Sequence, residues 1–380
     1  MNMRNALLLV ILASVAVSVQ QYLLPEREFW DSMRPQFNNY LIFKYSFSHL
    51  VHGEDLYALH TGHHGDYFKY SPTFALAMAP FHYLPDWLGL TLWSLLNSLI
   101  LLAGLALLPA IDEKKKFVLV LFILLELIGN LQNEQSNAMV TGFILLTFGF
   151  LERRKMWLAA LFVALGFYLK IFGIVAGVLF IFYPGKKEFI FSFLIWMALL
   201  LALPLIVVPP GYLLDQYQGW GALLNSDLDT RYGFSIMGIL DKWFGIAISR
   251  QLVMGAGIVL LGSVLLRVRC YGEFPFRLIF LSALLMWGIL FNHTAEPSGY
   301  ILAMTGIGIW FFGGRRTGLR TGLTIASFVL VSLVSTDLMP AGVRNDIIYP
   351  YYIRTLPVLV IWIIAMADMF RYRVATSSLE

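Results

Sequence analysis

Twelve apolar runs, separated by short polar segments, constrain this sequence more than any other feature. A helix needs about 20 apolar residues to cross a bilayer, and the backbone within the bilayer must satisfy its own hydrogen bonds, which favours helices. The chain has 59% hydrophobic and 13% charged residues with a mean hydropathy of +0.73, which excludes a soluble globular enzyme and a disordered chain. We therefore predict an all-α, polytopic membrane bundle of about 12 transmembrane helices that forms a single domain over residues 1–380. The runs are 6–24, 88–108, 117–130, 136–151, 156–169, 172–183, 189–208, 251–266, 278–291, 300–312, 321–335 and 355–370.

The Lys and Arg residues predict how these helices are oriented. Basic residues gather on the cytoplasmic side of membrane proteins, chiefly in short loops. If Arg4 is placed inside and the runs alternate, 17 of the 27 basic residues fall in short inner loops, and the long loops at 25–70, 209–250 and 336–354 fall outside. We predict a multi-pass protein of the inner (plasma) membrane with both termini cytoplasmic. No clustered basic face is present, so we expect the lipid bilayer and no nucleic acid as a partner.

The first outer loop carries most of the polar residues that can do chemistry. Its aromatic residues between Phe37 and Phe47 predict interfacial helices. The apolar piece 71–84 lies between Pro72 and Pro85, is too short to span, and is predicted to be re-entrant or interfacial. Six of the seven histidines lie in or just after this loop, and three of them precede Asp66 closely, but their spacing is not a tight metal motif. We predict no metal and no cofactor. The six histidines are His49, His52, His60, His63, His64 and His82.

An ordered set of short motifs runs along most of the chain. The aromatic segment is followed by Gly-x-Asp-x-Tyr, then Tyr-x-Pro, then Leu-Pro, and later by a Gln-x-Asn step, a Leu-Lys step and an outer Asn-His-x-x-Glu segment. This order, over about residues 37–305, resembles glycosyltransferase family 87. The residues that carry the resemblance are Gly53, Asp55, Tyr57, Tyr70, Pro72, Leu84, Pro85, Gln135, Asn137, Leu169, Lys170, Asn292, His293, Glu296 and Tyr300.

The resemblance implies a GT-C-like enzyme that works without a cofactor. The resemblance further implies that the enzyme transfers a hexosyl, mannosyl-like group from a polyprenyl-phosphate sugar donor to a lipid, glycolipid or cell-surface glycan acceptor at the extracytoplasmic face. Two alternatives stay open. One is a transporter or flippase of lipid-linked saccharides. The other is a catalytically inactive, sugar-lipid-binding relative, because Asn39 holds the position where the family usually has an acid, and an amide does not accept a proton as a general base does.

The chemistry implied by the family assigns expected roles to ten residues. The group that accepts the acceptor proton is sought among Asp55, Asp66, His293 and Glu296. Lys170 interrupts two apolar runs near an outer boundary and is expected to bind the donor phosphate. The full set of expected substrate-binding residues is Asn39, Lys69, Tyr70, Gln135, Asn137 and Lys170. Glu134 stands where the family commonly has Gly.

Overall fold

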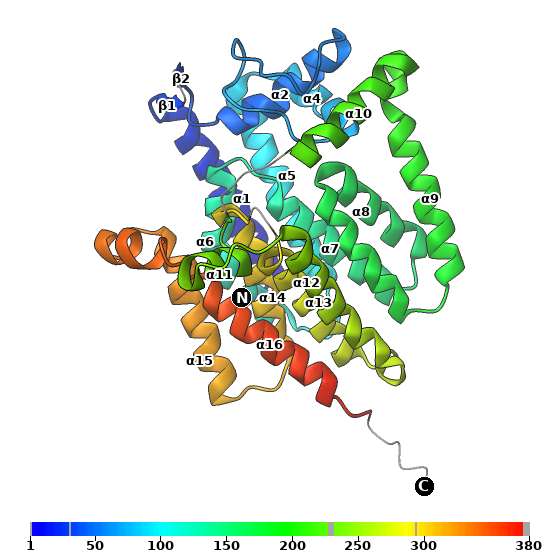
Figure 1. Ribbon diagram of the computed structural model, residues 1–380, viewed down its shortest axis with the longest axis vertical. Helices are drawn as coiled ribbons and strands as arrows, with labels where there is room; N and C mark the ends of the chain where they lie inside the picture. Colours follow the sequence, from blue (N-terminus) through cyan, green and yellow to red (C-terminus); the bar gives the residue numbers. More distant parts are fainter. Residues whose placement is uncertain (1, 30–31, 227–231, 293–294, 375–380) are drawn as a thin grey trace.

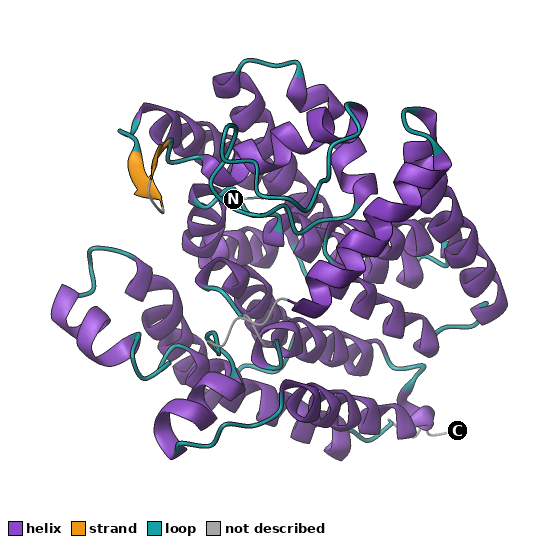
Figure 2. Cartoon of the chain, turned by 45° about the horizontal axis from the view of Figure 1, so that its top comes forward, coloured by secondary structure: helices purple, strands orange, loops and turns teal. Residues whose placement is uncertain are grey.

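A computed structural model describes residues 2–29, 32–226, 232–292 and 295–374 of the chain. These residues are mostly helical, and the only strands among them are β1 (Arg27–Phe29) and β2 (Ser32–Arg34), which pair antiparallel in a small hairpin at the edge of the molecule (Figure 2). The α-helices are α1 (Met3–Leu23), α2 (Asn38–Val51), α3 (Pro72–Ala77), α4 (Ala79–His82), α5 (Asp86–Leu107), α6 (Glu113–Gln132), α7 (Asn137–Glu152), α8 (Met156–Leu169), α9 (Lys186–Ala202), α10 (Pro210–Ser226), α11 (Ile236–Phe244), α12 (Arg250–Ser263), α13 (Phe274–Leu290), α14 (Tyr300–Gly313), α15 (Gly318–Ser327) and α16 (Thr355–Arg371). The 3₁₀ and π segments are η1 (Ile171–Phe182), η2 (Leu203–Ile206), η3 (Val264–Leu266), η4 (Val268–Cys270), η5 (Pro297–Gly299), η6 (Phe328–Ser332), η7 (Leu333–Ser335) and η8 (Val343–Ile348).

Each of the twelve apolar runs lies largely within a helical segment, which confirms the all-α class. Four helices among the described residues are long and apolar enough to cross a membrane: α1, α5, Lys186–Ile206 and Gly318–Ser335. Several others, such as α7 and α13, are apolar but shorter. The number of spanning helices and their orientation stay predictions.

Close helix packing depends on glycines at two crossings. A Cβ atom on Gly142 of α7 would lie 2.6 Å from the backbone of Ile100 in α5, and one on Gly306 of α14 would lie 2.7 Å from the carbonyl oxygen of Ser282 in α13. Small residues at helix crossings let two backbones approach closely, which is how helices associate in a bilayer. These two glycines therefore fix the α5–α7 and α13–α14 pairs.

One charged residue that interrupts an apolar run has a buried partner. Glu126 of α6 accepts a hydrogen bond from Arg354, with 3.2 Å between Nη2 and Oε1, and both side chains are buried. The guanidinium carbon lies 4.3 Å from the ring centre of Tyr300. Because a buried charge is tolerated only when it is paired, this contact explains an acid within the run 117–130. It ties α6 to the start of α16.

The first long loop is more buried than an interfacial position alone predicts. Helix α2 forms within it, but most of its side chains, including Tyr40, Phe43 and Phe47, are covered by neighbouring protein. Lys44 anchors the helix, since its Nζ lies 2.5 Å from Asp86 Oδ1 and donates to the carbonyl oxygen of Leu84 at 2.9 Å. The piece 71–84 forms the two short helices α3 and α4. Helices α2, α4 and α10 gather at one end of the molecule, at the top of Figure 1, and the last turn of α16 lies toward the other end.

Candidate functional site

A cavity of about 370 Å³ lies where several chain connections meet. Its lining comes from the first turns of α2, the segment that precedes α3, the α6–α7 and α8–η1 connections, and the segment between α13 and α14. Helices α10 and α12 add Trp220, Leu224 and Met254 to the lining. All of these connections belong to segments that the charge distribution predicts to be outside or near the outer boundary.

Lys170 forms the centre of one polar wall. It follows the last residue of α8 and has left the helical conformation (φ −143°, ψ 124°), so the chain turns there into η1. Its Nζ donates to Asn137 Oδ1 at 2.8 Å and to Gln135 Oε1 at 3.1 Å, and it lies 5.9 Å from the ring centre of Tyr70. The Tyr70 hydroxyl donates to the same Gln135 oxygen at 3.5 Å. Among the described residues Lys170 forms no ion pair, so two neutral amide oxygens hold its ammonium group.

A chain of hydrogen bonds continues from this lysine toward a carboxylate. Asn137 Nδ2 donates to Ser298 Oγ at 3.3 Å, and that hydroxyl donates to Glu296 Oε2 at 3.4 Å. Ser298 is buried at η5, where Pro297 turns the backbone back toward α14. The lysine and the carboxylate are thus joined through Asn137 and Ser298 without touching each other.

Two described carboxylates line the cavity, Asp66 and Glu296. Asp66 comes just after Gly65, whose N–H donates to Asn38 Oδ1 at 3.0 Å and so fixes the loop against the first turn of α2. One Asp66 oxygen accepts a hydrogen bond from the N–H of Tyr67 at 2.7 Å. Asp66 is half-buried and Glu296 is exposed, so both have room to accept a proton from a bound molecule.

The rest of the lining is apolar and aromatic. It includes Ile171 and Phe172 at the start of η1, and Trp287 and Phe291 at the end of α13. Sequence reasoning did not single out these side chains. Their signal was weak, because aromatic residues near the ends of apolar helices are common wherever a helix meets the membrane interface.

The structure brings eight of the ten predicted site residues to this cavity: Asn39, Asp66, Lys69, Tyr70, Gln135, Asn137, Lys170 and Glu296. Two of the ten are not among them. Asp55 does not line the cavity, and its Oδ1 caps a turn by accepting a hydrogen bond from the N–H of Tyr57 at 2.9 Å. His293 lies outside the described residues, although its neighbour Asn292 lines the cavity.

The amide at position 39 and the acid at position 134 lie near one edge of the site. Asn39 lines the cavity, and its Nδ2 donates to the carbonyl oxygen of Asn133 at 2.9 Å. Glu134 does not line the cavity. Its side chain is buried, and burial raises the pKa of this carboxyl well above its ordinary value, while the charge of Arg27 and the backbone N–H of Asn39 oppose the shift. Burial therefore disfavours the charged form of Glu134, which lies beside the site rather than in it.

Metal-ligand side chains gather elsewhere in the first loop. His49, Glu54 and His60 bring one ligand atom each to within 4.8 Å of one another. Asp66, which the sequence grouped with the loop histidines, belongs to the cavity instead, and Glu54 is the carboxylate that lies among them.

A comparison with known protein families establishes to which family the chain belongs. The sequence model of glycosyltransferase family 87 matches residues 68–336. The chain belongs to glycosyltransferase family 87. It is therefore a membrane glycosyltransferase, and the matched segment contains Lys170, Gln135, Asn137 and Glu296. Asn39 and Asp66 precede the matched segment. No curated protein matches the chain.

Proposed function

We propose that this family 87 chain transfers a hexosyl, mannosyl-like group from a polyprenyl-phosphate sugar to a lipid, glycolipid or cell-surface glycan acceptor at the extracytoplasmic face. The observation that carries the proposal is the composition of the cavity. It combines a lysine held by two amide oxygens, two carboxylates and an apolar, aromatic wall. These are the groups that a phosphate, an attacking hydroxyl and a lipid chain require.

The proposed role of Lys170 is to bind the donor phosphate. An ammonium group has three N–H donors, and two of them are used by Asn137 and Gln135. The third is available for a phosphate oxygen, and a charge-assisted hydrogen bond of this kind is stronger than a neutral one. The same charge stabilises the phosphate as it leaves, which lowers the barrier when the bond to the sugar breaks.

The proposed reaction is a single displacement. The acceptor hydroxyl oxygen forms a bond to the anomeric carbon while the bond from that carbon to the phosphate oxygen breaks, and its electron pair leaves with the phosphate. The hydroxyl proton goes to Glu296 or Asp66, the two described carboxylates that line the cavity. The displacement inverts the anomeric centre.

The apolar wall is proposed to hold the first part of the polyprenyl chain. Ile171, Phe172 and Phe291 supply the hydrocarbon surface. The cavity also collects side chains from the segments predicted to lie outside, which supports a site at the extracytoplasmic face of the inner membrane, with both termini in the cytoplasm.

The test is transfer of a labelled sugar by the purified full chain in detergent. The donor is a labelled polyprenyl-phosphate hexose, with mannose first, and the acceptors are a panel of membrane lipids and glycolipids. We expect a labelled product that depends on both the donor and the protein. The absence of product across the panel, with protein that unfolds cooperatively, would contradict the proposal. Movement of the donor across liposomes without a covalent product would favour the flippase alternative.

Asn39 favours a second candidate function, an inactive relative that binds the donor without turnover. Its amide lines the cavity at the position where the family usually has an acid. Donor binding without product in the same assay, together with turnover in Asn39→Asp, would establish this alternative. Equal turnover in the wild type and Asn39→Asp would instead show that the base lies elsewhere in the cavity.

A further inference from the structure

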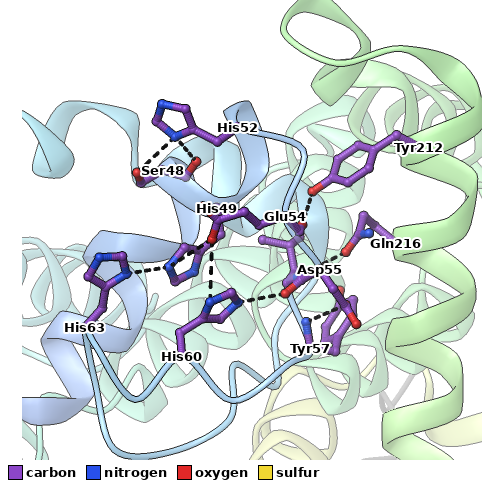
Figure 3. A network of polar contacts seen from close by, with 11 residues as sticks. Ser48, His49, His52, Glu54, Asp55, Tyr57, His60, His63, Tyr212 and Gln216 are labelled. Atoms are coloured by element: carbon purple, nitrogen blue, oxygen red, sulfur yellow. Dashed lines mark hydrogen bonds and ion pairs between the residues drawn. The ribbon is translucent and has the colours of Figure 1, made fainter.

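Imidazoles from the last turn of α2 and from the loop that follows it lie around one carboxylate (Figure 3). His49 lies in the last turn of α2, Glu54 follows the helix, and His60 lies six residues farther along. Glu54 Oε2 is 3.5 Å from His60 Nδ1 and 3.8 Å from His49 Nε2. His63 joins them, since its Nδ1 is 2.9 Å from His49 Nε2. Three side chains, those of His49, Glu54 and His60, thus bring ligand atoms to within 4.8 Å of one another, and His63 contacts the group through His49.

The hydrogen bond made by one ring nitrogen of His60 indicates which of its two nitrogens carries the hydrogen. Nε2 lies 2.8 Å from the carbonyl oxygen of Asp55. A carbonyl only accepts, so Nε2 carries the hydrogen, and Nδ1 is the ring nitrogen that faces Glu54. A backbone carbonyl that holds the distal N–H of an imidazole is also the usual outer contact of a metal-ligating histidine.

One ring nitrogen of His49 has no hydrogen-bond partner in the part of the chain that the structure describes. This nitrogen is Nδ1, and the side chain is buried. His64 is buried beside the group, with ring centres 5.7 Å from His49 and 5.9 Å from His60, and neither of its ring nitrogens has a hydrogen-bond partner among the described residues. The cluster therefore holds more nitrogen lone pairs than the neighbouring protein satisfies.

We propose that His49, Glu54 and His60 bind one Zn²⁺ ion. In a tetrahedral site with zinc–ligand bonds of about 2.0–2.1 Å, neighbouring ligand atoms lie about 3.3 Å apart. The separations of 3.5 and 3.8 Å between Glu54 Oε2 and the two imidazoles lie slightly above this value. Two imidazoles and one carboxylate suit zinc, whereas Mg²⁺ and Ca²⁺ prefer oxygen ligands throughout. The His49 and His60 rings are stacked with their centres 3.6 Å apart, so one ring turns when both bind the ion, and a water molecule completes the tetrahedron.

The ion would hold the loop that follows α2 in place against α10. Tyr212 of α10 donates to the carbonyl oxygen of Glu54 at 2.5 Å, and Gln216 accepts from the N–H of Leu56 at 2.9 Å (Figure 3). The same loop continues to Asp66 and Tyr70 at the cavity. A zinc ion that closes the loop at Glu54 and His60 thereby restrains one wall of the cavity. This role goes beyond the proposed transfer reaction and does not depend on the identity of donor or acceptor.

The test is zinc binding by the full chain, purified in detergent with a tag that contains no histidine. The protein is stripped with EDTA, desalted and titrated with ZnCl₂ in a calorimeter, and its metal content is measured after a second desalting step. We expect one zinc ion per chain and an increase in the unfolding temperature on zinc addition. The double variant His49→Ala/His60→Ala should bind none, and Glu54→Gln should bind at least about tenfold more weakly.

Two histidines outside the ligand set provide matched controls. His82 packs on Phe47, and His52 contacts Ser48, so His82→Ala and His52→Ala should bind zinc as the wild type does. Glu54 is 45% exposed, so Glu54→Gln keeps the fold even where the double variant does not, and it decides the result in that case. Failure of the wild type to bind one zinc ion, or unchanged affinity in Glu54→Gln, would overturn the proposal. Neither measurement requires transferase activity.

Discussion

One fully buried and one partly buried cation of this protein have different surroundings. Arg354 is completely buried in the packed core, where it pairs with Glu126 at 3.2 Å and stacks on Tyr300. Lys170 lines a cavity and is held by the amide oxygens of Asn137 and Gln135, with no carboxylate in contact among the described residues. The first charge is neutralised within the protein. The second is oriented but not neutralised, which is what a site for an anionic ligand requires.

The comparison predicts that the two cations contribute to different properties. Loss of a partner in a buried ion pair leaves an uncompensated charge and costs stability. Loss of a charge that faces a cavity costs binding and turnover instead. Each prediction below tests this separation.

The largest expected effect is on stability, at Arg354. Arg354→Met leaves Glu126 buried without its partner, and we expect the free energy of unfolding to fall by about 3–5 kcal/mol. The measurement is denaturant unfolding in detergent. The double variant Glu126→Leu/Arg354→Met removes both charges and should recover most of the loss. A double variant as unstable as the single one would show that the ion pair is not the cause.

Next in size is the effect of Lys170→Met on transfer. The substitution removes the cation that is proposed to bind the donor phosphate. We therefore expect the rate of sugar transfer to fall at least about 100-fold, with little change in the unfolding temperature. Lys187→Met is the matched control, because Lys187 is exposed at the start of α9 and does not line the cavity. A wild-type rate in Lys170→Met would remove this lysine from the mechanism.

The carboxylates are expected to have a somewhat smaller effect. We predict that Glu296→Gln lowers turnover at least about tenfold, because an amide no longer accepts the acceptor proton. Asp66→Asn is measured beside it, and the larger loss identifies the base. Asp55→Asn serves as the control, since Asp55 caps a turn outside the cavity. Equal rates in Asp66→Asn, Glu296→Gln and the wild type would exclude both carboxylates as the base.

Ser298→Ala should give the smallest effect. It breaks the hydrogen-bond chain between Asn137 and Glu296 but leaves both side chains in place. A single hydrogen bond contributes about 0.5–1.5 kcal/mol, so we expect a loss of about threefold to tenfold in turnover. A loss as large as that of Lys170→Met would mean that Ser298 contacts the substrate itself.

The all-α class was predictable from the sequence, because long apolar runs form helices whether they face lipid or other helices. The antiparallel pair of β1 and β2 was not, since three-residue strands leave no periodic signal. The burial of α2 was also missed. Its aromatic residues suit an interface and a protein core equally well, and only the neighbouring segments decide which they face.

The site was predictable residue by residue but not as an arrangement. Lys170, Asn137 and Glu296 were singled out by family motifs, whereas the contact of Asn137 with Ser298 joins positions 161 residues apart and depends on how α7 packs near η5. Glu54 was not recognised as the carboxylate of the histidine cluster. The turn at Gly53, with a positive φ of 71°, folds it back toward His49, and that reversal is a backbone property rather than a spacing.

Binding of a polyprenyl phosphate tests the central claim most directly, because it requires neither an acceptor nor a base. The purified wild type, Lys170→Met and Lys187→Met are titrated with the lipid phosphate, and the bound fraction is measured by native mass spectrometry. We predict that Lys170→Met weakens binding at least about tenfold, whereas Lys187→Met leaves it unchanged. Equal binding by all three proteins would contradict the assignment of the cavity to the donor phosphate.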